Sequence, residues 1–597
     1  MVHAARRWSQ LALILILAGV PLRSQEPDWV TRSNANSSVL LEVLARFAPE
    51  GAGRFGVDGL DEEVSQLPLD INDQTVTALE AAIGTLEERL AAETDAAVRQ
   101  DLGILIQAAE ENIEGTRVYE RNLLPYFDVA TTVFYGIHGL LDEQVAEERR
   151  PAALTRLRKY VGETEGLGPI TEQAEAFTRA RLGEPGLLGP FRDEVERNLA
   201  NTQRFVDGIA QLFEVHGIEG WEGAHARLAE QLAAYDAFVR DELLARARED
   251  FRLPAEVYAY NLKTVGVDMP VDELVSRAKT SFREIQNEMQ AVAEQVAAAR
   301  GLESSDYRDV LRELKKEQLV GEAILPHYEA RLGELERLVR EHDVVSLPER
   351  PAVIRLASEA ESAAVPAPHM QPPRLIGNTG ERGQFVLPLT IPGEGGEEDV
   401  GFDDFTFEAA SWTLTVHEAR PGHEMQWSAM VEKGVSLARA LFAFNSVNAE
   451  GWGLYAEAEM KPYMPLEGQL VSLQHRLMRA ARAYLDPGLQ LGEISRDEAF
   501  RVLEHEVVLS HAMAQQEVER YTFLAPAQAT AYFCGYQRLM ELRTDVERAL
   551  GDGFDRRAFH DFVLSQGLLP PALLRKAVME DFVPGRAPEL ATGMVRG

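Results

Sequence analysis

Cysteine is almost absent from this chain of 597 residues, which contains only Cys534. A single cysteine cannot form an internal disulfide, and it cannot supply the paired Cys or Cys/His spacing of a zinc ribbon. Cys534 lies in the apolar run A-Y-F-C-G-Y, which favours a buried, unreactive thiol. Disulfide scaffolds and zinc ribbons are therefore excluded, and cysteine-based catalysis is disfavoured.

Basic residues are scarce relative to acidic ones. The sequence has 60 Lys and Arg against 96 Asp and Glu, which gives a formal net charge of −36. No stretch combines clustered Lys and Arg with interleaved aromatic residues. Because proteins that bind polyanions carry a basic surface, we expect no nucleic-acid partner. Most of the excess acid is expected on solvated helix faces.

Long apolar runs are also missing. The run Leu11–Val20 is too short to span a bilayer comfortably. Arg6 and Arg7 precede it and Ser24 is a suitable cleavage residue, so residues 1–24 have the features of a secretory signal peptide. An uncleaved N-terminal anchor is the alternative, and a lipoprotein anchor is not supported because no cysteine follows the run. We expect a periplasmic or secreted protein with no stable membrane insertion after cleavage.

Helical patterning dominates what is present. From 34 to 343, apolar residues recur at three- and four-residue spacing, for example over 97–119 and 271–299. No fixed period repeats, so a solenoid is not indicated. The pattern changes at 346, and two short strands are predicted at 352–357 and 384–389. The sequence therefore predicts a mainly α fold, a large multi-helix body with a small β element before the helices of the candidate site.

This change of pattern divides the mature chain into a helical N-terminal region, 25–345, and a region with the candidate site, 346–597. We expect the two to form one continuous helical body. An exposed edge strand of the β element offers main-chain hydrogen bonds to an extended peptide. The alternative is a structural hairpin with no role in substrate binding.

The segment Thr415–Gln426, T-V-H-E-A-R-P-G-H-E-M-Q, carries the clearest chemistry. Imidazole nitrogens bind zinc well, and in the H-E-x-x-H arrangement the Glu after the first His acts as general base. Here His417 and His423 are six residues apart, which on an ideal helix separates them by about 120°. Pro421 and Gly422 favour a kink. We predict that this kink returns His423 to the side of His417.

A second segment, N-A-E-G-W-G-L-Y-A-E, supplies a third ligand in Glu450, far enough downstream for a loop and a return helix. Glu457 lies seven residues further on the same helix face and is expected to accept a hydrogen bond from a ligand histidine. The alternative is an unrelated histidine pair on a helix broken by proline. We predict one Zn²⁺ per chain, with manganese or cobalt as alternatives, held by His417, His423 and Glu450, with Glu418 as general base.

These motifs resemble those of the bacterial proteins of domain of unknown function 885 (DUF885). The resemblance implies a mainly helical zinc metallopeptidase with zincin-like active-site helices, distantly similar to thimet-type oligopeptidases and helical carboxypeptidases. It is specific from about 377 to 570 and looser before that. It implies the same three ligands and the same general base. The residues that carry it are His417-Glu418-x-x-Pro421-Gly422-His423-x-x-Gln426, Glu450-Gly451-Trp452, Tyr455, Glu457, Arg479, Arg482, Arg520-Tyr521 and Pro526-x-Gln528-Ala529.

Two positions depart from the family pattern. Gln490 stands where the family usually has His, and Ala527 stands where it has Gly. Neither is a proposed ligand. If the missing histidine binds substrate or the developing oxyanion, rate or specificity has changed. The departures therefore keep two alternatives open, a non-catalytic peptide-binding relative and an amidohydrolase that acts on a non-peptide amide.

A polar stripe is predicted near the end of the chain. Positions 528, 532, 536, 539 and 543 fall on one helical face and carry Gln, Tyr, Tyr, Leu and Arg. We predict that it lines the cleft, where Tyr532 stabilises the oxyanion and Gln528 and Arg543 hold substrate. Arg482 and Arg520 are also expected to bind substrate. The alternative is a satisfied internal network. Together these features predict a zinc-dependent hydrolase of short peptides.

Overall fold

The computed structural model describes residues 28–391, 400–401 and 403–586. The predicted signal peptide, residues 1–24, lies outside them. The described chain is mainly α, 69% helical with one small three-stranded mixed sheet, so the predicted fold class is confirmed. Within these ranges, no helix combines the length and the apolar character that crossing a membrane requires.

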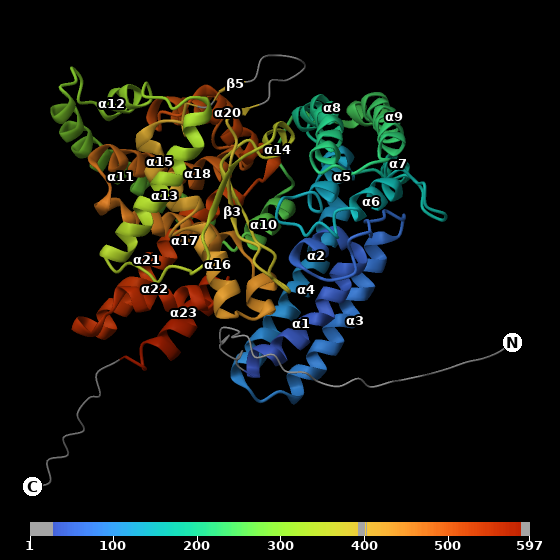
Figure 1. The fold of residues 1–597 in the computed structure, drawn as a ribbon, viewed down its shortest axis with the longest axis horizontal. Helices are drawn as coiled ribbons and strands as arrows, with labels where there is room; N and C mark the ends of the chain where they lie inside the picture. Colours follow the sequence, from blue (N-terminus) through green and yellow to red (C-terminus); the bar gives the residue numbers. More distant parts are fainter. Residues whose placement is uncertain (1–27, 392–399, 402, 587–597) are drawn as a thin grey trace, which may run out of the picture.

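The N-terminal helices form two groups that lie beside the rest of the chain (Figure 1). The first packs around a core that includes Leu86, Leu102 and Leu105. Asp95 caps its longest helix by accepting hydrogen bonds from two backbone N–H groups of the first turn. This group comprises α1 (Asp28–Phe47), α2 (Pro49–Phe55), α3 (Ile71–Ala92) and α4 (Ala96–Asn122).

The second group surrounds a core rich in aromatic residues, among them Phe134, Phe205 and Phe213. A π-helical turn, η1 (Val239–Leu243), and a 3₁₀ turn, η2 (Leu244–Arg246), lead out of it. The group comprises α5 (Val129–His138), α6 (Ala152–Tyr160), α7 (Ile170–Arg181), α8 (Arg192–Val215) and α9 (Glu222–Phe238).

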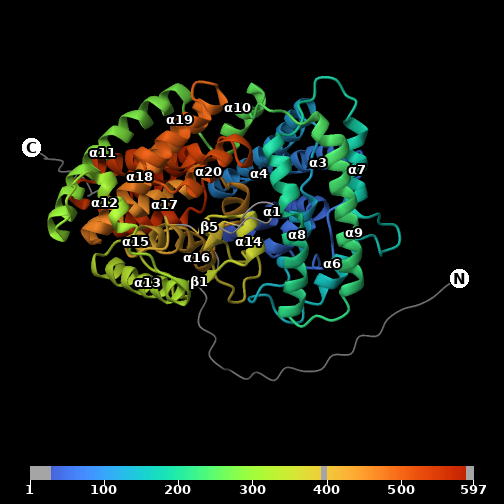
Figure 2. The same cartoon turned by 90° about the horizontal axis from the view of Figure 1, so that it is seen from above.

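One long helix, α11 (Val271–Arg300), contributes to the core of the site region. Its buried residues recur every three or four positions, and it ends at Gly301 in the left-handed conformation. It packs along α18 (Leu466–Gln490), as Figure 2 shows. The neighbouring elements are α10 (Ala255–Thr264), α12 (Tyr307–Leu314), η3 (Gly321–Ala323) and α13 (Ile324–Glu341).

The predicted β element is present as a three-stranded sheet. Its central strand, β3 (Gln384–Leu387), is fully buried and runs parallel to β1 (Val353–Leu356) and antiparallel to β2 (His369–Gln371). The two predicted strands are therefore parallel neighbours and not a hairpin, because α14 (Glu359–Ala364) and β2 intervene. A separate pair, β4 (Thr390–Ile391) and β5 (Val400–Gly401), follows. The predicted regional boundary at 345/346 falls in the loop between α13 and β1 and stays a prediction.

The site region is organised around α18, which is buried on nearly all sides from Leu470 onward. It contacts α15 and α21, and α17 packs along α21. The helices of this region are α15 (Glu408–Glu418), α16 (His423–Lys433), α17 (Ser446–Met460), α19 (Arg496–Arg501), α20 (His511–Glu519), α21 (Ala531–Leu550), α22 (Arg556–Ser565) and α23 (Pro571–Ala577). Short π or 3₁₀ turns lie between them or follow the last one: η5 (Ala438–Phe442), η6 (Lys461–Tyr463), η7 (Val502–Glu506), η8 (Arg520–Leu524), η9 (Gln528–Thr530), η10 (Gly551–Gly553) and η11 (Val578–Phe582).

Candidate metal centre

The helix carrying the first histidine is broken where the sequence predicts a kink. α15 ends at Glu418 and α16 begins at His423, so the two histidines lie on separate helices joined by four residues. The turn is so tight that a Cβ on Gly422 would lie 2.0 Å from the His417 carbonyl oxygen. Only glycine fits there, which explains its place between the two histidines.

Two residues for which the sequence indicates no structural role, Arg420 and Trp452, hold this turn in place. The buried Arg420 guanidinium donates hydrogen bonds of 2.6 Å to both Glu424 and Glu336. The Trp452 indole N–H donates to the Pro421 carbonyl oxygen at 2.9 Å. The turn is therefore fixed by charged and indole groups from three directions, so His423 enters α16 in a defined orientation.

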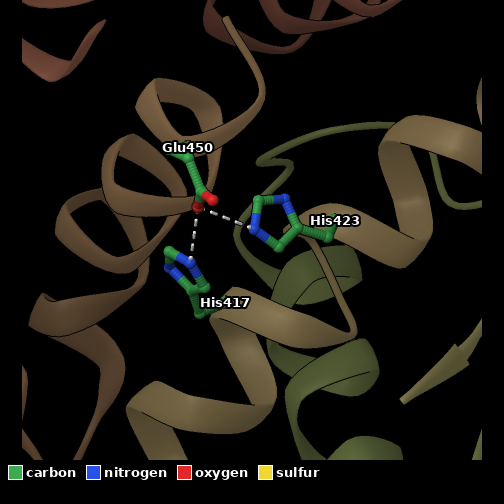
Figure 3. Close-up of side chains that lie close together, drawn as sticks. All are labelled: His417, His423 and Glu450. Atoms are coloured by element: carbon green, nitrogen blue, oxygen red, sulfur yellow. Dashed lines mark hydrogen bonds and ion pairs between the residues drawn. The ribbon is translucent and has the colours of Figure 1, made fainter. Parts of the chain in front are cut away.

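Three side chains converge from α15, α16 and α17 (Figure 3). The Oε2 atom of Glu450 lies 3.5 Å from His417 Nε2 and 3.2 Å from His423 Nε2. The three ligand atoms all lie within 4.8 Å of one another, and the two imidazole rings are 4.6 Å apart at an angle of 79°. These residues form a group that can hold a metal ion.

The spacing fits a small tetrahedral cation. Zinc bonds to N and O of about 2.0–2.1 Å imply ligand–ligand separations of roughly 3.3–3.4 Å. Both measured separations from Glu450 lie within 0.2 Å of that value. The donor set of two imidazoles and one carboxylate is also one that zinc binds well.

Glycines admit the close approach that the group requires. A Cβ on Gly453 would lie 2.7 Å from Cε1 of His417, so no larger residue fits opposite the imidazole. A Cβ on Gly451 would lie 2.6 Å from the Gly535 Cα, where α17 meets α21. The pattern Glu-Gly-Trp-Gly thus places three features on one turn of α17. Glu450 belongs to the possible metal-binding group, Gly451 and Gly453 allow close contacts with α21 and His417, and the Trp452 indole binds the turn at Pro421.

Glu457 lies behind the first histidine. Its Oε1 is 2.7 Å from His417 Nδ1, its Oε2 accepts from the Thr413 hydroxyl at 2.6 Å, and Arg479 lies 3.5 Å away. Burial opposes ionisation, but Arg479 and His417 hold the pKa of Glu457 at about 2. When the imidazole is neutral, an ionised Glu457 favours its proton on Nδ1 and leaves Nε2 available for a metal.

The charge state of His417 in the ion-free site follows from its neighbours. Burial lowers its pKa, but the carboxylates of Glu450 and Glu457 outweigh burial and raise it to about 9. Glu418, the last residue of α15, contributes in the same direction. The site therefore concentrates negative charge around its imidazoles, which favours a cation between them.

Glu418 itself is buried, with 7% of its surface exposed. Within the described residues it makes no hydrogen bond or ion pair. Its carboxylate is near enough to His417 to act on that residue's charge. A buried acid without a partner beside the triad is therefore available for proton transfer.

The structure gathers three more predicted residues beside the triad. Gln528 donates to Glu450 Oε1 at 3.1 Å and accepts from Arg520 at 3.0 Å. Arg520 also donates to the Tyr532 hydroxyl at 2.9 Å, and the Tyr532 ring stacks near His417 with centroids 6.1 Å apart. Burial raises the pKa of Tyr532 while Arg520 opposes it. Since arginine only donates, Tyr532 keeps its own O–H for another acceptor.

The remaining two predicted substrate residues are engaged elsewhere. Arg482 stacks over the Tyr532 ring at 4.5 Å, but its guanidinium is bound by the buried Glu517 at 2.7 and 2.5 Å. Arg543 contacts Glu459 and Tyr455. It lies about 16 Å along α21 from Tyr532, from the rise per residue. The predicted stripe is not continuous, because Gln528 lies in the 3₁₀ turn η9 before α21.

The two residues that depart from the family pattern, Gln490 and Ala527, both make hydrogen bonds that connect separate chain segments. The Gln490 amide donates to the Tyr521 carbonyl at 2.7 Å and accepts from the Leu253 N–H at 3.0 Å. Ala527 has a φ of 83°, and its N–H donates to both oxygens of Asp486. Among the described contacts, neither residue touches the triad.

The fold and site thus define a mainly helical protein with a buried His-His-Glu group that can hold a metal. The profile of a bacterial protein family of unknown function, DUF885, matches residues 49–578, and the chain belongs to that family. The structure is similar to that of a candidate lipoprotein from Colwellia psychrerythraea, with a TM-score of 0.73 and 17% identity over 93% of this chain and 99% of that one. It is also similar to a candidate lipoprotein of unknown function from Shewanella oneidensis, with a TM-score of 0.66 and 19% identity over 93% of this chain and 100% of that one. At these identities the likeness shows the fold alone, and no curated protein matches the sequence.

Proposed function

We propose that this protein is a zinc-dependent hydrolase of peptide bonds that acts on short peptides. The observation that carries the proposal is the convergence of His417, His423 and Glu450 beside the unpartnered Glu418. A buried acid next to a His-His-Glu group is the arrangement that metal-assisted hydrolysis requires. When bound, zinc lowers the pKa of a bound water towards ~7 and polarises a carbonyl oxygen.

The protein's own residues divide the remaining work. Glu418 takes a proton from the attacking water and returns it to the leaving amine, because it is the free carboxylate beside the ligands. Tyr532 donates its O–H to the oxygen on which negative charge develops, and Arg520 holds the tyrosine in place at 2.9 Å. Gln528 fixes Glu450 Oε1, so that Oε2 faces both histidines.

We propose that the protein is located in the cell envelope, in the periplasm, or is secreted. The two similar structures belong to proteins described as candidate lipoproteins, which supports an envelope location. The predicted N-terminal signal peptide points in the same direction. The proposed binding partner is a short peptide substrate. Nucleic acid is not proposed as a partner, because the formal net charge of the chain is −36.

The test combines metal content with turnover. Wild type should contain about one zinc per chain by plasma mass spectrometry and should cleave members of a mixed peptide library. Glu418→Gln should keep the metal and lose turnover by about 100-fold or more, since general base catalysis typically contributes that much. His423→Ala should lose the metal. Glu408→Gln is the matched control, because this carboxylate is exposed on the same helix, α15.

Each outcome discriminates between the candidate functions. Full turnover in Glu418→Gln would show that Glu418 is not the general base. A metal-free wild type, expressed with zinc supplied, would refute the metal centre. Peptides retained intact by the metal-loaded protein would favour the peptide-binding alternative, and cleavage of a non-peptide amide alone would favour an amidohydrolase.

A further inference from the structure

A cavity of about 340 Å³ lies where the N-terminal helices meet the three-stranded sheet. Its walls come from the end of α2, the end of α5 and the segment that carries β2 and the start of β3. None of the residues of the candidate metal centre lines it. The cavity is within the range of small-molecule pockets, at its lower end.

The lining of this cavity is cationic, against the charge of the whole chain. The charged residues that line it are four arginines and two acids, Arg54, Arg149, Arg374, Arg382, Asp142 and Glu381. In a protein with a formal net charge of −36, such a local excess of arginine is not what the average composition produces. An arginine that is not already paired with a carboxylate would favour a negatively charged group there.

Two of the arginines are already paired with carboxylates. Arg149 binds Asp61 through two hydrogen bonds of 2.8 and 2.7 Å. Arg374 donates to Asp58 at 2.8 Å and to the Ile376 carbonyl oxygen. These two side chains shape the wall, and their hydrogen-bonding capacity is largely used within the protein.

Arg54 is different, because no carboxylate meets it. Within the described residues its guanidinium has no hydrogen bond or ion pair, although it lines the cavity. The Arg54 side chain reaches solvent at the cavity mouth, and the protein around it still lowers its pKa by desolvation, which Tyr135 opposes. The Tyr135 hydroxyl and the Arg382 guanidinium also have no partner in the described part of the chain. Three donor groups around one cavity therefore remain unused.

We propose that this cavity binds a small molecule through an oxyanion, a carboxylate or phosphate group held by Arg54 with Tyr135 and Arg382. The planar guanidinium matches either group with two parallel hydrogen bonds. A phenol adds a third donor at low entropic cost. The site is independent of the proposed hydrolase activity.

The experiment measures binding to the metal-loaded protein by isothermal titration calorimetry. The probes are inorganic phosphate, N-acetylglycine and the neutral N-acetylglycinamide. Wild type should bind phosphate, N-acetylglycine or both saturably, and should not bind the amide. Arg54→Gln should weaken that binding at least tenfold, and Tyr135→Phe should weaken it to a smaller extent. The preferred anion then identifies whether phosphate or carboxylate is the natural group.

The matched control is Arg283→Gln. Like Arg54, Arg283 of α11 is exposed and makes no hydrogen bond or ion pair among the described residues, but it does not line this cavity. Because Arg54 has no partner to lose, its substitution should leave the circular dichroism spectrum unchanged. Saturable binding of neither anion would overturn the proposal. So would binding that Arg54→Gln leaves unchanged, since that pattern places the anion elsewhere, including on the metal.

Discussion

His417 and Glu457 lie with Nδ1 and Oε1 only 2.7 Å apart, on helices α15 and α17. The same helix α17 carries Glu450, whose carboxylate faces the other nitrogen of that imidazole. One helix therefore holds both ring nitrogens of His417 between two carboxylates. This arrangement fixes the orientation of the ring, with a carboxylate facing each of its nitrogens.

Glu457→Gln should weaken metal affinity by about 10–100-fold, the usual effect of losing a carboxylate that orients a ligand histidine. The neutral amide oxygen accepts a hydrogen bond from Nδ1 more weakly than a carboxylate does, so it holds the imidazole proton on Nδ1 less firmly. Competition with a chromogenic chelator measures the change. Glu459→Gln is the control on the same helix, because Glu459 pairs with Arg543 and not with a histidine. Equal affinities in the two variants would contradict the role assigned to Glu457.

Because the pKa of the Asp486 carboxyl is raised in the folded protein, its contribution to the free energy of unfolding falls as pH rises. Burial raises its pKa to about 7, although Tyr258 and the Ala527 N–H act against burial. The folded carboxyl therefore keeps a proton up to about pH 7, whereas the unfolded one loses it near pH ~4. Its contribution to the free energy of unfolding is present below pH ~4 and is lost as pH rises through 7.

Asp486→Asn should remove this contribution, because an amide does not titrate. Urea unfolding at pH 4.5 and 7.5 gives the free energy of unfolding at each pH. The fall between the two values should be smaller in the variant than in wild type, on the order of a few kcal/mol. An identical fall in both proteins would show that Asp486 titrates normally in the folded state.

Ala527→Gly should stabilise the protein by about 1 kcal/mol, because Ala527 has a φ of 83° and glycine adopts that conformation without strain. Chemical denaturation measures the change. Ala529→Gly is the matched control, since Ala529 lies in the 3₁₀ turn η9 without positive φ and should lose stability. If Ala527→Gly is no more stable than wild type, the left-handed alanine carries no measurable strain.

The sequence was sufficient to predict that His417, His423 and Glu450 come together, because each of them lies in a short motif. Spacing, proline and glycine predict a broken helix, and the structure has one between Glu418 and His423. The residues that hold the turn gave no such signal. Trp452 reaches Pro421 from another helix and Arg420 reaches Glu336 from far upstream, so only the folded chain reveals these contacts.

The polar stripe predicted over residues 528–543 is a case in which the sequence pattern was misleading. A period of 3.6 placed Gln528 and Arg543 on one face, but the chain is a 3₁₀ turn at Gln528 and becomes α-helical only at Ala531. Arg543 is drawn to Glu459 on α17, a partner that periodicity cannot reveal. Strand β2 was missed for a related reason, because His369–Gln371 is too short to show an alternating pattern.

Gly453→Ala should disturb the metal centre directly, through the ring of His417. Its Cβ would lie 2.7 Å from the His417 ring, and that ring cannot retreat because Glu457 stands behind it. We expect metal content to fall well below that of wild type in plasma mass spectrometry. Gly84→Ala, in helix α3 with nothing within 4 Å of its Cβ, should keep the metal and gain up to about 1 kcal/mol of stability. A Gly453→Ala protein with full metal content would show that His417 tolerates displacement, and the close packing of α15 against α17 would then serve stability alone.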